Sequence, residues 1–261
     1  MWHERVIYMN GPIFYTAGHT DALDHAVKAL KQKGCEFAHK PDKTVTHLLL
    51  PVPSFETDGT VKGGDSLADI LELLSRNVTV LGGNLGHFVP AGYKAVDLLQ
   101  DTFYLAENAD ITAHCAVKLA TSKLPVTLKG CHILVVGWGR IGKCLAALLK
   151  NMGAIVTVAA RKESDRAMLL ALGYDTLDPR RLSYELLRFR VIFNTVPVMV
   201  LPAEKMQHCA ADCLKIDLAS ILGMEADDVI WARGLPNKDA PESSGALIAR
   251  TALHIVKGAL L

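Results

Sequence analysis

The chain has 261 residues, of which half are hydrophobic and 21% are charged, and its formal net charge is +1. This composition excludes intrinsic disorder, and the balanced charge argues against a broad surface for nucleic acid or anionic membrane. No run reaches the ~18 apolar residues of a membrane span, and no basic start leads into a long apolar stretch, so we expect a cytoplasmic protein with no membrane or nucleic-acid partner.

Strand and helix patterns alternate along the first half of the chain. Short apolar runs predict strands, and amphipathic runs at helical spacing predict the helices between them. The predicted strands are Arg5–Asn10, Cys35–Ala38, His47–Val52, Val78–Leu81 and Phe103–Leu105. The predicted helices are Asp21–Lys33, Ser66–Ser75 and Gly92–Leu99. This alternation predicts a parallel sheet wrapped by helices.

The same alternation restarts more strongly after a linking helix, Ile111–Ala120. The predicted strands are His132–Val136, Ile155–Ala159, Val191–Asn194, Cys213–Asp217 and Asp228–Trp231. The predicted helices are Ile141–Met152, Ser164–Leu172, Leu182–Leu187 and Ser243–Leu261. The last helix has an apolar stripe that must dock on the first domain or on another copy of the chain, so a homo-oligomer stays open.

A glycine-rich turn follows the first strand of this second half. Its residues are Gly137, Trp138, Gly139, Arg140, Ile141 and Gly142. Gly137 permits the tight turn, Gly139 lets the backbone approach a pyrophosphate, and Gly142 permits close packing of helix on strand. Free N–H groups and the dipole of the helix that follows would hold the anion. The motif predicts a Rossmann dinucleotide-binding domain and a nicotinamide cofactor.

These patterns predict an α/β fold with two domains, each a parallel sheet wrapped by helices. Residues 1–110 form the N-terminal substrate domain, and the C-terminal helix, residues 241–261, packs back on it. Residues 111–240 form the NAD(P)-binding Rossmann domain, which includes the linking helix.

The end of the second Rossmann strand bears on the choice between NAD and NADP. An acidic residue at this place would bond the ribose 2′-hydroxyl of NAD, whereas this chain has Arg161. A guanidinium suits the 2′-phosphate of NADP, and Lys162 and Ser164 could assist it. We therefore favour NADP, while Glu163 and Asp165 keep NAD open.

Two later strand ends should lie near the cofactor, because ligands of open α/β sheets bind beyond the carboxyl ends of the strands. One end carries Asn194, Thr195 and Pro197, and the next carries Asp217 and Ser220. Thr195 and Ser220 could bond the cofactor carboxamide or the substrate, which makes them candidate catalytic residues. Asp217 is either part of the cofactor site or a structural hydrogen-bond anchor.

Polar residues on loops of the first domain are candidates for binding a substrate carboxylate. They are Ser54, Thr57, Asn84 and His87, and the alternative is an ordinary polar surface. His114 opens the predicted linking helix and could act as an acid or base, since histidine titrates near neutrality. Cys209 and Cys213 beside His208 are too few ligands for a metal site, so we predict no metal and reduced thiols.

In this order, the motifs resemble the A-type component of dipicolinate synthase over most of the chain. The matching stretches are Leu49-Leu50-Pro51-Val52, Gly137–Gly142, Gly153-Ala154 leading to Ala160-Arg161, Asn194–Pro197, Asp217–Ser220, Gly234-Leu235-Pro236, and Ala240-Pro241 before Gly245. The resemblance implies an NADP-linked oxidation that yields pyridine-2,6-dicarboxylate (dipicolinate) from a dihydrodipicolinate-like precursor. It also implies a flavoprotein-like second subunit as partner, and a role in dipicolinic acid biosynthesis during sporulation.

Three positions depart from this family's pattern. The family has an arginine, a lysine and a Glu-Gly pair where this chain has Ile221, Glu242 and His114-Cys115, respectively. A dicarboxylate substrate favours cations, so the departures leave two alternatives open. One is a dehydrogenase of the shikimate or 2-hydroxy-acid type that acts on another small carboxylate. The other is a non-catalytic subunit that binds NADP.

Overall fold

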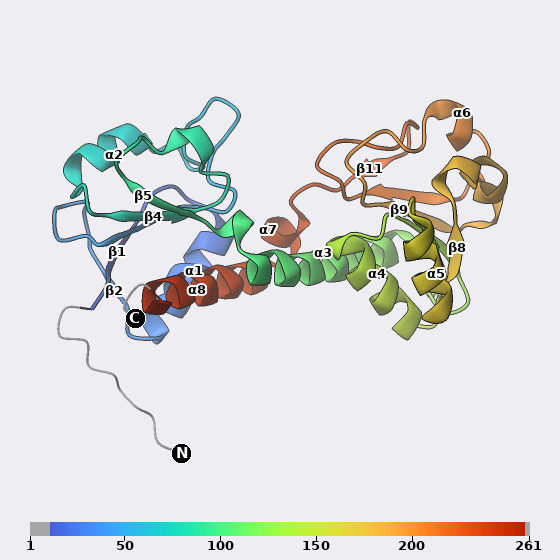
Figure 1. Ribbon diagram of the computed structural model, residues 1–261, viewed down its shortest axis with the longest axis horizontal. Helices are drawn as coiled ribbons and strands as arrows, with labels where there is room; N and C mark the ends of the chain where they lie inside the picture. The colour runs from blue at the N-terminus through green and yellow to red at the C-terminus, as the bar shows by residue number, and fades with distance from the viewer. Residues whose placement is uncertain (1–10, 259–261) are drawn as a thin grey trace, which may run out of the picture. The chain divides into compact units, whose positions relative to one another are not determined.

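The structure is a computed structural model that describes residues 11–258 (Figure 1). It divides into two compact units, one made of the described residues up to Asn108 and from Ala240 onward, and the other of Ala109–Asp239. Each unit is a parallel β-sheet flanked by helices, which confirms the predicted α/β fold class. No helix among residues 11–258 is both long enough and apolar enough to cross a membrane.

The first unit contains a five-stranded parallel sheet with the order β2-β1-β3-β4-β5. Its strands are β1 (Ile13–Thr16), β2 (Glu36–Phe37), β3 (His47–Leu49), β4 (Thr79–Gly82) and β5 (Lys94–Asp97). Its helices are α1 (Asp21–Gln32), α2 (Leu67–Leu73), the 3₁₀ helices η1 (Gly86–Phe88) and η2 (Leu98–Gln100), the start of α3 (Thr102–Lys123), and α8 (Pro241–Gly258). The chain reverses direction across the sheet between β1 and β3, which makes their carboxyl ends the expected place for a ligand.

Helices α1 and α8 of the first unit lie side by side (Figure 1). The hydroxyl oxygen of Thr20 caps α1 by accepting a hydrogen bond from the Leu23 N–H at 3.2 Å. In α8, a Cβ atom added to Gly245 would lie 2.5 Å from the carbonyl oxygen of Ala22. Only glycine therefore allows the two backbones to approach this closely.

Two predicted elements of the first unit are wrong. Gly92–Leu99 is not a helix, because its middle pairs in register with β4 and completes the sheet as β5. Phe103–Leu105 is not a strand, because the Asp101 carboxylate accepts a hydrogen bond from the Tyr104 N–H at 2.7 Å and starts α3 there. The predicted strand Arg5–Asn10 lies outside the described residues.

The second unit contains a six-stranded parallel sheet with the order β11-β10-β9-β6-β7-β8. Its strands are β6 (His132–Val136), β7 (Ile155–Ala159), β8 (Asp175–Leu177), β9 (Val191–Asn194), β10 (Leu214–Asp217) and β11 (Ile230–Trp231). Its helices are the rest of α3, α4 (Arg140–Asn151), α5 (Glu163–Ala171), the 3₁₀ helix η3 (Pro179–Arg188), α6 (Ala203–Met206) and α7 (Leu235–Asp239). Counted from β6, this is the Rossmann strand order, with β6 and β9 at the switch point.

Three strands of the second unit have the bounds that the sequence predicts, namely β6, β7 and β9. Each is a run of buried apolar residues between polar or glycine-containing turns, a strong strand signal. The short strand β8 and the short helices α6 and α7 were not predicted. The segment Leu182–Leu187 lies inside the 3₁₀ helix η3 rather than forming an α-helix.

Candidate functional site

The glycine turn between β6 and α4 has the geometry of a phosphate-binding loop. Gly137 has a φ angle of +108°, and a Cβ atom there would lie 2.4 Å from the hydroxyl oxygen of Thr195. At Gly142, a Cβ atom would lie 2.2 Å from the carbonyl oxygen of Gly137. Both positions therefore require glycine for the turn to close on the first turn of α4.

Gly139 is different, because the space beside it is open. A Cβ atom added there would have no heavy atom within 4 Å, and its φ angle of −81° suits any residue. Gly139 caps α4 without a side-chain hydrogen bond. An uncapped N-terminus of a long helix beside open space fits a pyrophosphate, which approaches the backbone at this glycine. The residues of the turn thus fit a dinucleotide cofactor.

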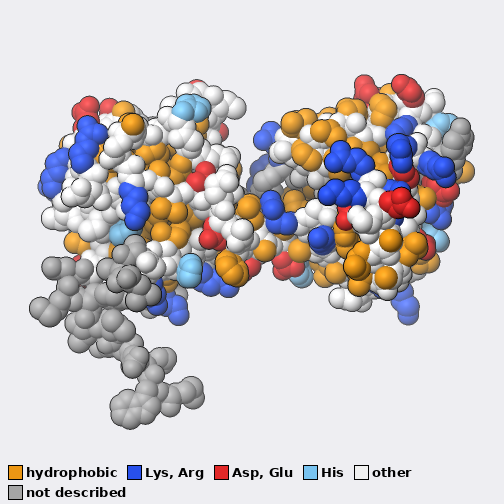
Figure 2. Space-filling view, in the orientation of Figure 1, with side chains coloured by type: hydrophobic (Ala, Val, Ile, Leu, Met, Phe, Trp, Pro, Cys, Tyr) orange, Lys and Arg blue, Asp and Glu red, His pale blue; other side chains and the backbone are white. Residues whose placement is uncertain are grey.

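The remaining side chains of the turn lie around this space. Trp138 and Ile141 are half-buried, and Arg140 is exposed at the start of α4. The Trp138 ring packs edge-on against Tyr174, with ring centroids 6.0 Å apart. Basic side chains gather on the face of the second unit that Figure 2 shows, which favours an anionic ligand.

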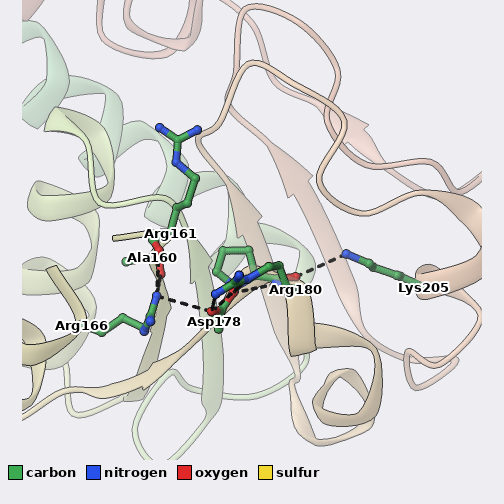
Figure 3. Close-up of polar contacts among 7 residues, drawn as sticks. Ala160, Arg161, Arg166, Asp178, Arg180 and Lys205 are labelled. Carbon is green, nitrogen blue, oxygen red and sulfur yellow. Dashed lines mark hydrogen bonds and ion pairs between the residues drawn. The ribbon is translucent and has the colours of Figure 1, made fainter. Parts of the chain in front are cut away.

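The end of β7 presents an arginine held on a fixed backbone (Figure 3). The Arg166 guanidinium donates hydrogen bonds to the carbonyl oxygens of Ala160 and Arg161, both at 2.8 Å. The side chain of Arg161 points away from this cluster, is exposed, and makes no hydrogen bond or ion pair to any other described residue. Its guanidinium is therefore available to a ligand. Lys162 and Ser164 are also exposed, at the cap and in the first turn of α5.

The acidic group in this region is neutralised by its neighbours. The carboxylate of Asp178, which follows β8, accepts hydrogen bonds from Arg180 and lies 3.7 Å from Arg166. The side-chain hydrogen bond from Arg180 and that from its backbone N–H hold the pKa of Asp178 well below its usual range. Asp178 is thus a stable anion already paired with two cations, and its charge does not repel a phosphate strongly.

Asn194 and Asp217, both predicted cofactor contacts, are fully buried. The Asp217 carboxylate accepts hydrogen bonds from the Asn194 amide at 2.9 Å, the Ala219 N–H at 2.9 Å and the Gly223 N–H at 2.8 Å. Asp217 is therefore the structural anchor of the two possibilities that the sequence left open. The pair fixes the loops after β9 and β10, and it positions the residues that follow.

Those following residues differ in exposure. Thr195 is half-buried, and its hydroxyl donates to the carbonyl oxygen of Val136 at 2.9 Å, which braces the glycine turn from below. Pro197 and Ser220 are exposed beyond the ends of β9 and β10. Ser220 is thus the candidate catalytic residue of this edge whose side chain faces solvent.

The substrate candidates of the first unit also divide by exposure. Ser54 is fully buried, and its hydroxyl donates to the Pro51 carbonyl at 2.7 Å and accepts from the Gly83 N–H at 2.9 Å. It fastens the loops after β3 and β4 together. Thr57, Asn84 and His87 are exposed, as a binding role requires.

His114 lies in the middle of α3 rather than at the start of a helix, because α3 begins at Thr102. Its side chain is 63% exposed, and its Nε2 atom lies 3.9 Å from the Asp110 carboxylate one turn earlier. This arrangement is an ordinary surface pair on one helix.

Two residues that the sequence reasoning missed lie at the switch point of the first unit. The His19 N–H donates to the Lys62 carbonyl at 2.7 Å, so the loop before α2 folds against the carboxyl end of β1. Both residues carry side chains that can bind a carboxylate. The strand order β2-β1-β3 reveals this place, and that order depends on long-range pairing that no local pattern encodes.

The comparisons with known proteins agree with this geometry. No family model matches the chain. Among curated proteins, it is similar to the A-type component of dipicolinate synthase from Bacillus subtilis (strain 168), at 23% identity over 248 residues, covering 88% of this chain and 83% of that protein. The resemblance to this component of dipicolinate synthase is thereby confirmed.

Solved structures show the same fold. The A chain of dipicolinate synthase from Bacillus subtilis superposes with a TM-score of 0.80 at 20% identity, covering 97% of this chain and 98% of that one. A transhydrogenase from Sinorhizobium meliloti gives a TM-score of 0.70 at 15% identity, covering 95% of this chain and 94% of that one. The chain therefore has an oxidoreductase-type fold of two α/β units.

Two departures from the dipicolinate synthase pattern lie on the surface. Ile221 is 61% exposed on the loop after β10. Glu242 is exposed in the first turn of α8, where its negative charge suits the helix dipole. Neither change disturbs the core, so both affect the chemistry of the surface rather than the fold.

Proposed function

We propose that the chain is an NADP-dependent oxidoreductase that converts a dihydrodipicolinate-like substrate to dipicolinate. The observation that carries the proposal is the open space at Gly139, between two glycines that close the turn onto α4. NADP, when bound, accepts the hydride that leaves the substrate ring, and aromatisation releases a proton as well. The residues of this chain bind and orient the two molecules.

Arg161 supports NADP as the cofactor. Its exposed guanidinium projects from the end of β7, the strand end that meets the adenosine ribose in this fold. Two parallel N–H groups can bind a phosphate in a fork, whereas no acidic side chain replaces Arg161 to accept a bond from a 2′-hydroxyl. Arg166 acts as a positioning residue, since it holds the carbonyls on either side of the Ala160–Arg161 peptide.

Lys62 and His19 are the groups that we assign to the substrate carboxylates. They lie at the carboxyl ends of β1 and β3, where the strand order of the first unit reverses. Lysine binds a carboxylate as a point charge, and histidine can donate a hydrogen bond. Thr57, Asn84 and His87 are further exposed donors on loops of the same unit.

The proposal is tested by dipicolinate formation, followed by its ultraviolet absorbance. The purified chain is supplied with NADP and freshly generated hydroxy-tetrahydrodipicolinate, with and without a flavoprotein-like second subunit, which we propose as its partner. Dipicolinate that appears together with an equal amount of NADPH supports the reaction. A chain that binds NADPH and yields no dipicolinate in either arm rejects this substrate.

Ile221 favours a second candidate, a dehydrogenase for another small carboxylate. An exposed isoleucine stands where the family has an arginine, so one cation that would meet a dicarboxylate is absent. If the substrate is a dicarboxylate, Ile221→Arg should raise kcat/KM, because it adds a charge at an exposed position without disturbing the core. If kcat/KM for dicarboxylates does not rise while a monocarboxylate is oxidised, the second candidate is supported.

A further inference from the structure

Two cysteines lie in contact just before β10, away from the glycine turn. Cys213 is buried at the start of that strand, and its N–H donates to the Ala210 carbonyl at 3.0 Å, which makes the segment between the cysteines a tight turn. The Cys213 thiol donates a hydrogen bond to the sulfur of Cys209. The turn therefore brings the two sulfur atoms together in the folded chain.

The sulfur of Cys209 is reachable from solvent. Cys209 is half-buried and lines an open hollow of about 660 Å³, together with Met206, Met224, Lys215 and Asp228. Cys213 does not line this hollow and is only 3% exposed. A small reagent thus reaches Cys209 first and Cys213 only through Cys209.

The charges around the pair give the two thiols different roles. The Lys215 ammonium is buried between the Cys213 carbonyl, at 3.1 Å, and the Asp228 carboxylate, at 2.6 Å. The hydrogen bond from Cys213 and the charge of Lys215 lower the pKa of Cys209, although burial and Asp228 oppose them. Donating that hydrogen bond, together with burial, raises the pKa of Cys213. Cys209 is the nucleophile, and Cys213 keeps its proton until the second step.

We propose that Cys209 and Cys213 form a redox-active dithiol that exchanges with small-molecule disulfides and closes to an internal disulfide. In the first step the Cys209 thiolate attacks one sulfur of the small disulfide, forms a mixed disulfide and releases one thiolate. In the second step Cys213 loses its proton and attacks the Cys209 sulfur, which releases the second small thiol. The dithiol loses two electrons and two protons, and one small disulfide becomes two small thiols. This chemistry needs neither NADP nor the proposed substrate.

Trypsin provides a direct test, since cleavage after Lys205 and Lys215 places both cysteines in one peptide without the other four. The reduced full chain is incubated with glutathione disulfide, remaining thiols are alkylated, and the peptide is weighed. We expect a peptide that lacks two hydrogen atoms and carries no alkyl group. A wild-type peptide that carries two alkyl groups, or a lasting glutathione adduct at Cys209, overturns the proposal.

Three variants sharpen this test. Cys213→Ser should stop the reaction at the mixed disulfide on Cys209, because the second nucleophile is gone. Cys209→Ser should slow the loss of the Cys213 thiol about tenfold or more, because the buried thiol has no reachable partner. The control Cys35→Ser should leave closure unchanged. Closure that proceeds equally in Cys209→Ser, through some other cysteine, contradicts the assignment.

Discussion

The Asn194 amide donates a hydrogen bond to the buried Asp217 carboxylate at 2.9 Å, and this bond joins the ends of β9 and β10. Two backbone N–H groups complete the coordination of the same carboxylate. Asp217→Ala should lower the free energy of unfolding by about 3 kcal/mol or more, because three buried donors lose their acceptor. Urea denaturation measures this change. The exposed Asp227→Ala serves as the control, and a loss below about 1 kcal/mol for Asp217→Ala would count against the anchor role.

Arg161→Gln should discriminate between the two cofactors. We expect the Kd for NADPH to rise about tenfold or more and the Kd for NADH to change little, since only NADPH carries the 2′-phosphate. Fluorescence titration gives both constants. Arg180→Gln is the matched control, because that arginine is also exposed but is paired with Asp178. An equal weakening of both cofactors by Arg161→Gln would refute the assignment.

Lys62→Met should act on the substrate and not on the cofactor. Methionine keeps most of the apolar stem but removes the charge, so we expect KM for a carboxylated substrate to rise about tenfold while the Kd for NADPH stays constant. Steady-state kinetics and cofactor titration separate the two effects. The exposed Lys94→Met on β5 is the control. An unchanged KM would remove Lys62 from the substrate site.

The lowered pKa of Cys209 predicts a distinctive pH profile of alkylation. The thiolate is the reactive form, so a thiol with a lowered pKa remains reactive at a pH where ordinary thiols are protonated. Burial raises the pKa of Cys35, which therefore needs a higher pH. Rates of iodoacetamide labelling, read peptide by peptide, should give a lower midpoint for Cys209 than for Cys35. The reverse order would contradict the electrostatic account of the pair.

The sequence predicts the Rossmann unit better than the first unit, for a physical reason. Strands such as β6 and β9 are buried apolar runs whose pattern is local, and the glycines of the turn are constrained by their own backbone. The strand β5 has an exposed start and becomes a strand only by pairing with β4, which overrides a local preference for helix. The prediction of a helix over Gly92–Leu99 was wrong for this reason.

The site divides along the same line. The sequence indicates which residues follow the strands, but not which of them turn inward. Ser54 and Asp217 are polar residues at strand ends like their neighbours, yet both are fully buried in internal hydrogen bonds. His19 and Lys62 were missed because their place depends on the order of strands in the sheet.

The most direct test of cofactor binding at the glycine turn compares the affinity of the wild-type chain and of Gly139→Val for NADPH, measured by calorimetry beside a thermal melt. Valine fits the open space and the backbone angles at Gly139, so the melting temperature should be unchanged. It also fills the space that the pyrophosphate would use, so the Kd for NADPH should rise about tenfold or more. A variant that folds normally and binds NADPH as tightly as the wild type would contradict the claim that this turn holds the cofactor.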